Sequence, residues 1–294
     1  MTNPPRFARS RLHLPGRGIT LSIIDFGGQG PLALLAHATG FCAALWEPVA
    51  VRLRERFHVL AYDARGHGDS DKPADEHAYG WSGFAEDYAA VARALATSAA
   101  VERVAVAIGS SIGGTSALAA AARDPRLFGA VVALDPVVIP ERPSGTQPTR
   151  SALEDGALRR RNVFESRAAI RAKWRERGRF ADWDPRALDL YLEHGFADRA
   201  DGQVELKCPN VIEAAIYRRG VEFSIWAQIG HLRTPARIVV AARQREMPAE
   251  IVESLAARSA AAELAHMDGT HLLPMVMPDR VADDILDFTA RAGF

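Results

Sequence analysis

The sequence has little cysteine and no excess of charge of either sign. Its two cysteines, Cys42 and Cys208, lie neither in a CxxC motif nor at a spacing typical of metal ligands. Neither a disulfide framework nor a zinc site is therefore indicated, and we expect two free thiols. The 36 basic residues equal the 36 acidic residues in number. This balance argues against a nucleic-acid partner or an anionic membrane surface.

The sequence also lacks a long hydrophobic run. No stretch of about 18 consecutive apolar residues occurs, and a membrane-spanning helix would need one. Pro4, Arg6 and Arg9 occur where a signal peptide would need its hydrophobic segment. We therefore expect a soluble, cytoplasmic protein without membrane insertion. No pattern in the sequence specifies an oligomeric state.

What the sequence does contain is a regular alternation of strands and helices. Short apolar runs predict buried strands, and longer alanine-rich segments between them predict helices. Strands are expected at residues 19–25, 32–36, 57–62, 104–108, 130–134 and 238–242. Helices are expected at residues 45–56, 81–97, 113–123, 249–259 and 278–291. This order predicts an α/β fold with a mostly parallel sheet and helices on both of its faces.

One segment interrupts this alternation. Residues 140–232 contain no clear buried strand and have a charged, helical pattern. Because a loop of this length without structure of its own would be unusual, we expect a helical cap inserted into a core of residues 1–139 and 233–294. Its arginine-rich stretch, 159–179, is either a solvated helix face or a site for an acidic group. Five cap aromatics form either the cap's own core or an apolar substrate pocket: Trp174, Trp183, Tyr191, Tyr217 and Trp226.

The strongest motif surrounds Ser111. An apolar strand is followed by Gly109-Ser110-Ser111-Ile112-Gly113 and then by an alanine-rich helix. Gly-x-Ser-x-Gly between a strand and a helix forces the serine into a sharp, strained turn, and glycines beside it avoid collisions. The N-terminus of the next helix favours developing negative charge. We therefore predict that Ser111, rather than Ser110, is a nucleophile.

A second motif follows the strand at 32–36. The loop of residues 37–41 can direct a backbone N–H toward the oxyanion that forms when a serine attacks a carbonyl, with the N–H of Ile112 as second donor. In these residues the chain resembles the α/β-hydrolase superfamily, in which the third residue of a His-Gly-x loop supplies an oxyanion-hole N–H. The resemblance implies this role for Thr39, with Ala38 standing where glycine is usual. It also places Phe41 and Trp46 in the substrate pocket.

The loop from Asp63 to Ser70 is similar to the Asp-x-Arg-Gly-x-Gly-x-Ser loop of the same superfamily. The resemblance implies an architectural role, in which Asp63 and Arg65 tie a turn near the active site and His67 belongs to that turn. It covers residues 18–138 and 234–294. It implies a sheet of about eight strands with an inserted cap, as in the capped serine hydrolases and esterases.

The predicted general base is His271. It lies in a Gly-Thr-His segment that follows one more short strand, which ends near His266, and precedes the terminal helix. This position fits the chain order serine, acid, histidine of the superfamily. His266, at the end of that strand, is the weaker candidate.

The acid that orients the base has two candidates. Most superfamily members place an aspartate after the strand that corresponds to 238–242, but the acidic residue here is Glu246. Asp135, at the end of the preceding strand, occupies a position from which some members recruit their acid. We favour Asp135 and keep Glu246 as the alternative.

Together these residues predict hydrolysis of a carboxylic ester, or a related acyl bond, in a small-molecule substrate through an acyl-enzyme. The chemistry needs neither a metal nor an organic cofactor. A C–C bond hydrolase and a cofactor-free perhydrolase use the same triad and remain alternatives. An alternative of another class is a non-catalytic small-molecule receptor built on the same fold.

Overall fold

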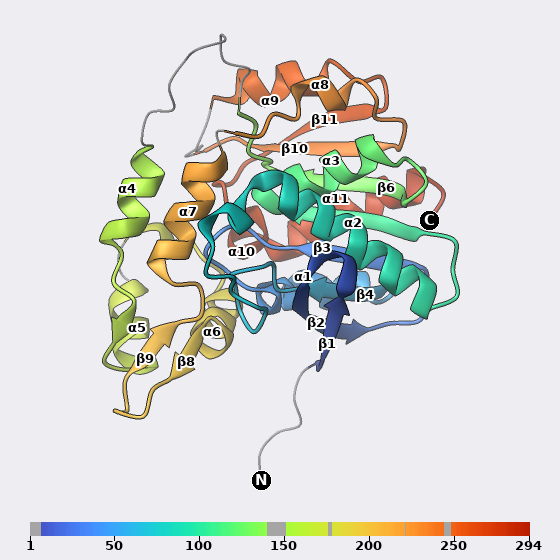
Figure 1. Cartoon of the computed structure of the whole chain (residues 1–294). Helices are drawn as coiled ribbons and strands as arrows, with labels where there is room; N and C mark the ends of the chain where they lie inside the picture. The colour runs from blue at the N-terminus through green and yellow to red at the C-terminus, as the bar shows by residue number, and fades with distance from the viewer. Residues whose placement is uncertain (1–6, 140–150, 176–177, 221, 244–247) are drawn as a thin grey trace.

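Eight strands form one continuous sheet at the centre of the protein, in the order β1-β2-β4-β3-β5-β6-β10-β11 (Figure 1). The pairs β1–β2 and β2–β4 are antiparallel, and the pairs from β4 to β11 are parallel. This computed structural model describes residues 7–139, 151–175, 178–220, 222–243 and 248–294. The predicted α/β fold, with a mostly parallel sheet of about eight strands, is confirmed.

The sheet strands and their covering helices agree closely with the sequence prediction. The strands are β1 (Ala8–Leu14), β2 (Ile19–Gly27), β3 (Leu32–Ala36), β4 (His58–Tyr62), β5 (Val104–Ser110), β6 (Phe128–Leu134), β10 (Ala236–Ala241) and β11 (Ala262–Met267). The helices are α1 (Glu47–Leu53), α2 (Trp81–Ser98), α3 (Ile112–Arg123), α9 (Ala249–Ala256), α10 (Leu273–Val276) and α11 (Pro278–Arg291). Strand β1 was not predicted, because Leu14 is its only buried residue and the apolar signal is weak.

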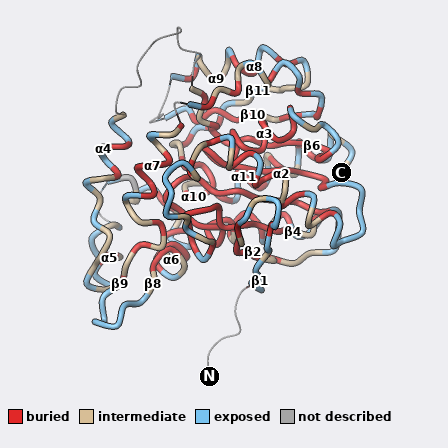
Figure 2. The backbone as a smooth tube through the Cα atoms, in the orientation of Figure 1, coloured by how far each residue is buried: buried red, intermediate tan, exposed pale blue. Residues whose placement is uncertain are grey.

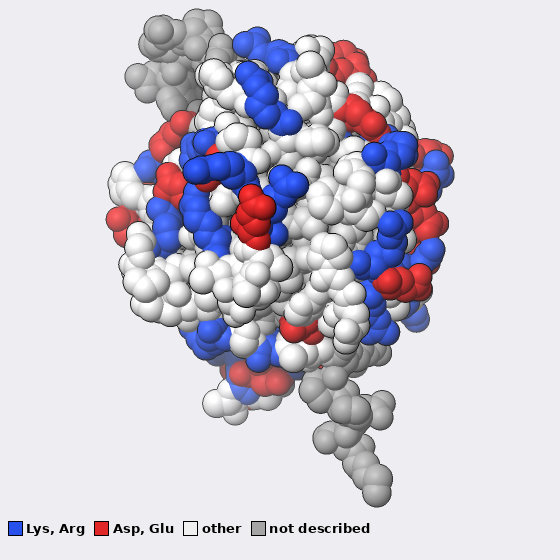
Figure 3. Space-filling model, turned by 90° about the vertical axis from the view of Figure 1, so that its right-hand side faces the viewer, with Lys and Arg blue, Asp and Glu red and all other residues white. Residues whose placement is uncertain are grey.

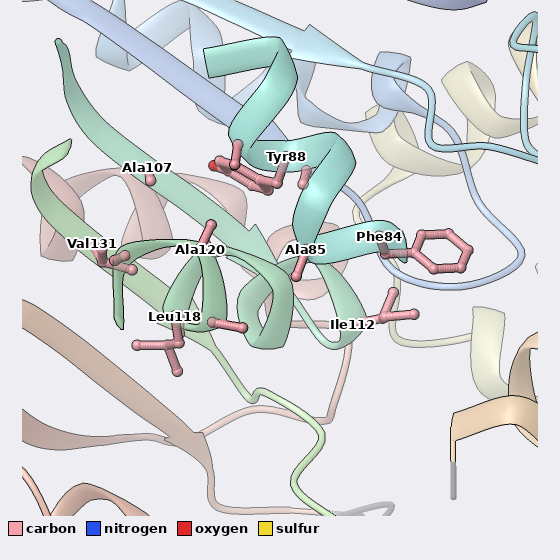
Figure 4. Close-up of a cluster of buried hydrophobic side chains, with 14 of the residues drawn as sticks. Phe84, Ala85, Tyr88, Ala107, Ile112, Leu118, Ala120 and Val131 are labelled. Atoms are coloured by element: carbon pink, nitrogen blue, oxygen red, sulfur yellow. The ribbon is translucent and has the colours of Figure 1, made fainter. Parts of the chain in front are cut away.

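Two hydrophobic clusters hold the layers together, one on each face of the sheet. Helices α2, α3 and α9 cover one face, and α1 and α11 cover the other. Every residue of β3, β5 and β6 is buried, as expected for parallel strands between two helical layers (Figure 2). Figure 4 shows part of the first cluster, to which α2 contributes Tyr88, α3 contributes Leu118 and β6 contributes Val131. These central strands carry the site described below at their carboxyl ends.

The elements between residues 151 and 220 gather beside one end of the sheet, at the left of Figure 1, whereas residues 226–229 lie at the top beside α9. Their helices are α4 (Ala152–Arg159), α5 (Arg167–Trp174), α6 (Pro185–His194), α7 (Asn210–Gly220) and α8 (Trp226–Ile229). They also contain a small antiparallel sheet of β7 (Val163–Phe164), β9 (Val204–Leu206) and β8 (Phe196–Asp198). The expected helical character of this segment is seen in its five helices, whereas its short strands were not predicted, because strands of two or three residues leave too short a pattern to detect. Residues 140–150, where the predicted cap begins, lie outside the described residues.

Arginines of the stretch 159–179 pair with carboxylates from other parts of this segment. The pairs are Arg160 with Glu213, Arg167 with Asp198, and Arg171 with Asp189. These three arginines therefore connect the short elements of the cap to one another. They account for part of the local charge without an acidic ligand.

Surface charge and thiols agree with the composition. Acidic and basic side chains are interspersed on the face shown in Figure 3. Cys42 and Cys208 are buried and free, which confirms the expectation of two free thiols. Within the part of the chain that the structure describes, no helix has both the length and the apolar character needed to cross a bilayer.

Candidate active site

Ser111 occupies the sharp turn between β5 and α3. Its backbone has φ 56° and ψ −122°, which a residue with a side chain adopts only under strain. Its N–H donates to the carbonyl oxygen of Leu134 at 3.0 Å, so the neighbouring strand β6 helps to hold the turn. The strained backbone is thus over-determined by its surroundings, as is common at functional sites.

Two glycines make this turn possible, because neither position has room for a side chain. A Cβ on Gly109 would lie 2.2 Å from the carbonyl carbon of Gly113, and a Cβ on Gly113 would lie 2.4 Å from the carbonyl oxygen of Ala36. Strands β3 and β5 and helix α3 therefore meet backbone against backbone around Ser111. This close approach is the physical reason for the Gly-x-Ser-x-Gly pattern.

His271 brings Ser111 and Asp135 into one hydrogen-bonded series. Its Nε2 lies 3.0 Å from Ser111 Oγ, and its Nδ1 lies 2.6 Å from Asp135 Oδ2. The side chains of His271 and Asp135 are 13% and 8% exposed, so water competes little for these bonds. A carboxylate at Nδ1 keeps the proton on that nitrogen and leaves Nε2 free to accept one from serine.

Asp135 is itself fixed by the end of β10. Its N–H donates to the carbonyl oxygen of Val239 at 2.7 Å, and its Oδ1 accepts the N–H of Ala241 at 2.9 Å. Its other oxygen, Oδ2, faces His271. The structure thus brings the favoured acid to the base, whereas Glu246 lies outside the described residues. His266 lies on β11 with a half-exposed side chain near Glu253.

The loop after β3 presents a peptide unit next to Ser111. The carbonyl oxygen of Ala38 accepts a hydrogen bond from His37 Nδ1 at 2.8 Å and another from the N–H of Phe41 at 3.3 Å. Since a trans peptide holds its C=O and N–H on opposite sides, these bonds direct the N–H of Thr39 the other way. Thr39 and Ser111 line the same cavity.

Two buried histidines hold this loop from the core side. His67 Nε2 accepts the N–H of Gly40 at 2.9 Å, and His37 Nε2 accepts the N–H of Ala64 at 3.0 Å. Burial lowers the pKa of both imidazoles, so both are neutral at pH 7 and each Nε2 can accept a hydrogen bond. His67 therefore acts within the turn, in keeping with its interpretation from sequence.

The loop that carries His67 is anchored by charged side chains. Asp63 accepts the N–H groups of Ala43 and Asp69, at 2.7 and 3.0 Å. Arg65 donates two hydrogen bonds to Asp87 of α2, at 2.6 and 2.7 Å. These bonds tie the loop both to the segment after β3 and to a covering helix.

Ile112 is the first residue of α3. The N–H groups of the first helical turn have no acceptor within the helix, so the Ile112 N–H is available beside Ser111. Its side chain is buried in the cluster that also contains Phe84 (Figure 4). This burial fixes the start of α3, whose N-terminus points partial positive charge at the serine.

A cavity of about 120 Å³ adjoins Ser111 and His271. Core loops and cap contribute its lining: Ala38, Thr39, Phe41, Ser111, Val137, Leu153, Asp182, Tyr217, Thr270, His271 and Leu272. Of the two predicted pocket residues, Phe41 lines the cavity and Trp46 does not. Trp46 ends a short 3-10 helix, η2 (Ala43–Trp46), that turns its indole into the hydrophobic cluster of the core, where it is 2% exposed. The prediction for Trp46 is corrected accordingly.

The cap aromatics divide between the two uses considered from sequence. Trp174, Trp183 and Tyr191 pack against one another inside the cap. Tyr217 lines the cavity, and Trp226 of α8 packs against the core cluster to which α3 and α9 contribute. Sequence reasoning did not single out Asp182 or Leu153 as lining residues. Asp182 lies in a turn and Leu153 on the short helix α4, and the local pattern of neither segment indicates which residue faces the cavity.

Residues of metal-ligand type do not gather in the described ranges: no group of three or more His, Cys, Asp or Glu there is placed to hold a metal ion.

The part of the chain that is similar to known proteins contains all the residues of the candidate site. A family model described as "Alpha/beta hydrolase family" matches residues 33–284, a range that contains Thr39, Ser111, Asp135 and His271. The solved structure of E-2-(acetamidomethylene)succinate hydrolase has a TM-score of 0.79 and 26% identity, covering 97% of this chain and 99% of that chain. An enol-lactonase from Burkholderia xenovorans has a TM-score of 0.71 and 19% identity, covering 96% of this chain and 100% of that chain, which shows the fold alone.

Two curated relatives match a shorter part of the chain. A 2-(acetamidomethylene)succinate hydrolase of Mesorhizobium japonicum is 40% identical over 117 residues, which are 40% of this chain and 39% of the relative. An esterase of Mycobacterium tuberculosis is 35% identical over 115 residues, which are 39% of this chain and 36% of the esterase. The aligned part thus spans well under half of either relative's length.

Proposed function

The chain belongs to the alpha/beta hydrolase family, and from this premise we propose that it is a serine hydrolase that cleaves a carboxylic ester or a related acyl bond. Ser111 is the nucleophile, His271 the general base, and Asp135 the acid that orients the base. One observation carries the proposal: His271 lies 3.0 Å from Ser111 Oγ through Nε2 and 2.6 Å from Asp135 Oδ2 through Nδ1, beside a cavity.

In the first half of the reaction, Nε2 of His271 accepts the Ser111 proton while Oγ attacks the substrate carbonyl carbon. The carbonyl oxygen becomes negative, and the N–H groups of Thr39 and Ile112 stabilise it. Asp135 stabilises the imidazolium that forms. The imidazolium then donates its proton to the leaving group, which departs and leaves the acyl group on Ser111.

In the second half, water replaces the leaving group. Nε2 of His271 accepts a proton from the water as its oxygen attacks the acyl-enzyme carbonyl. The same two N–H groups hold the second oxyanion. The C–O bond to Ser111 then breaks, His271 returns the proton to Oγ, and the carboxylic acid leaves.

The relatives support hydrolysis of an acyl bond in a small molecule without specifying which one. One relative is named for 2-(acetamidomethylene)succinate and another is named an esterase. A C–C bond hydrolase or a perhydrolase would keep the same three residues and differ in the pocket and the second nucleophile. A non-catalytic receptor would not need Ser111, His271 or Asp135 to be reactive.

Labelling with a fluorophosphonate, followed by peptide mass analysis, tests the nucleophile. Folded protein is expected to be labelled on Ser111, and unfolded protein is not. Ser110→Ala is the matched control, because the neighbouring hydroxyl is buried and has no hydrogen-bond partner among the described residues. It is expected to keep the labelling. Absence of label on folded protein would support the receptor.

A substrate panel tests the bond. p-Nitrophenyl esters of increasing acyl length are compared with an acyl amide and a vinylogous diketone, and ester turnover is also followed with added peroxide. We expect the highest kcat/KM for an ester. Faster cleavage of the diketone, or peracid as the main product, would replace the ester assignment by the corresponding alternative.

A further inference from the structure

Three helices of the cap converge on Gly40, the residue that follows Thr39. The phenol of Tyr191, on α6, donates a hydrogen bond to the carbonyl oxygen of Gly40 at 3.0 Å. Arg160, immediately after α4, donates to the Tyr191 oxygen at 2.6 Å and to Glu213 of α7 at 2.7 Å. The loop of residues 37–41, which carries the Thr39 N–H, is therefore in direct contact with a series of hydrogen-bonded cap side chains.

The backbone at Gly40 lies close to the ion pair of Arg160 and Glu213. Gly40 has φ +83°, and a Cβ there would lie 2.8 Å from Glu213 Oε1 and 3.2 Å from Arg160 Nη1. The left-handed backbone conformation favours glycine here, and the ends of the two charged side chains lie close to its Cα.

The hydrogen-bonded chain is enclosed by protein. Tyr191 is 1% exposed and Glu213 is 4% exposed, and the Arg160 side chain is 18% exposed. Burial raises the pKa of Tyr191 to about 12, so its hydroxyl stays protonated and can donate to Gly40. Phe41 and Trp183 pack against its ring, with centroids at 5.2 and 5.9 Å. A buried ion pair adds little net stability but defines a geometry, and here that geometry is the position of the phenol.

The hydrogen bond from Tyr191 is one of three side-chain hydrogen bonds that hold the backbone of this loop. Between Ala38 and Phe41 there are three peptide units, and each one is hydrogen-bonded to a side chain. His37 bonds to the carbonyl of the first, which carries the Thr39 N–H, and His67 bonds to the N–H of the second. Tyr191 bonds to the carbonyl of the third. Because neighbouring planes are joined at a shared Cα atom, the three bonds together restrict the segment that carries the Thr39 N–H.

We propose that Tyr191, held by Arg160 and Glu213, is a positioning residue of the oxyanion hole, through which the cap fixes the direction of the Thr39 N–H. This inference rests on the proposed serine-hydrolase function. Because the N–H acts on charge that develops in the transition state, losing its alignment lowers kcat and leaves substrate binding unchanged. Removal of a whole oxyanion donor costs about 10²–10³ in kcat, so misalignment of one donor is expected to cost roughly tenfold.

The test compares Tyr191→Phe with Tyr79→Phe in ester hydrolysis. The control loses a phenol-to-carbonyl hydrogen bond of the same kind, from Tyr79 to Pro73 at 2.7 Å, away from Gly40. Tyr191→Phe is expected to lower kcat about tenfold with KM within about twofold. It should also weaken, by the same factor, the binding of a trifluoromethyl ketone inhibitor, which forms an oxyanion when the serine attacks it. Tyr79→Phe should change neither quantity by more than about twofold.

Two further variants keep the inference testable if Tyr191→Phe does not fold. Glu213→Gln removes the charge that holds Arg160, and Arg160→Lys keeps the positive charge but has one donor nitrogen in place of the two that reach Glu213 and Tyr191. Both are expected to lower kcat in the same direction by less than Tyr191→Phe. An unchanged kcat in a folded Tyr191→Phe or Glu213→Gln, a rise in KM alone, or an equal loss in Tyr79→Phe would overturn the inference. If the wild type is not labelled by fluorophosphonate, the proposed function fails and this inference with it, whereas a labelled wild type separates the two.

Discussion

The core and the cap of this protein are stabilised in different ways. In the core, every residue of β3, β5 and β6 is buried, and Ser111 and Asp135 follow directly on the ends of β5 and β6. In the cap, α5 buries only Ile170 of its eight residues, and the strands have two or three residues. Arginine–carboxylate pairs and packed aromatic rings connect these short elements.

This difference separates two kinds of functional residue. Ser111 and Asp135 are placed at strand ends by backbone hydrogen bonds to the neighbouring strands of the core. Cap residues such as Asp182 and Tyr217 are placed by side-chain contacts between short elements. Substitutions in the core are therefore expected to abolish chemistry, and substitutions in the cap are expected to adjust alignment and substrate choice.

The largest effect is expected for Ser111→Ala. Without the nucleophile, kcat for an ester should fall by roughly 10⁴–10⁶, by analogy with serine and histidine removal in subtilisin. The melting temperature should not decrease, because the substitution removes only a hydroxyl from a turn that the backbone defines. Steady-state kinetics and thermal unfolding measure the two quantities. Full ester hydrolysis by a folded Ser111→Ala protein would place the chemistry elsewhere.

The next largest effect distinguishes the two acids. Asp135→Asn should lower kcat by about 10⁴, because an amide at Nδ1 favours the wrong imidazole tautomer. Glu246→Gln is the matched control and should stay within about twofold of the wild type. Both variants are measured with one ester at pH 7.5. If Glu246→Gln lost most of its kcat while Asp135→Asn kept it, Glu246 would be the acid of the triad.

The buried histidines give the core a dependence of stability on pH. Burial lowers the pKa of His37 and His67 in the folded protein, whereas the unfolded chain takes up protons near pH 6.5. Their contribution to stability is fully present above that pH and is lost as the pH falls, by up to about 1.4 kcal/mol per pH unit for each histidine.

Urea unfolding at pH 7.5 and 5.5 measures this dependence. His67→Gln should reduce the loss of stability between the two pH values. His266→Gln is the control, because that side chain is half-exposed on β11. Equal pH dependence in the wild type and in His67→Gln would show that the buried imidazole does not carry the effect.

The smallest effect is expected in the cap, for Asp182→Asn. Asp182 contributes a carboxylate to the lining of the cavity, so a cationic ester should be preferred over an anionic ester of the same size. Because Asp182 is exposed, the preference in kcat/KM should change only about two- to fivefold in the variant, and less at high salt. An unchanged ratio of kcat/KM at low salt would remove Asp182 from substrate selection.

Much of the core could be predicted from local patterns. The apolar run 32–36 coincides with β3, and the helix expected at 278–291 coincides with α11. The turn at Ser111 was also readable, because Gly109 and Gly113 are required wherever backbones meet at that distance. These features depend on residues that are neighbours in sequence.

Other features depend on residues that are distant in sequence. The sequence left Asp135 and Glu246 open, because an acid is chosen by its distance from the base. Trp46 was assigned to the pocket, yet the turn of η2 directs it into the core. The cap sheet was missed because its strands are short and partly exposed.

By itself, then, the sequence determined the strand-helix alternation, the strained serine turn and the candidate base, because hydrophobic periodicity and glycine sterics act over a few residues. Only the tertiary structure placed Asp135 beside His271 and brought Arg160, Tyr191 and Glu213 together at Gly40. These contacts join residues up to 151 positions apart, and no local pattern encodes which side chains will meet when the sheet and the cap pack.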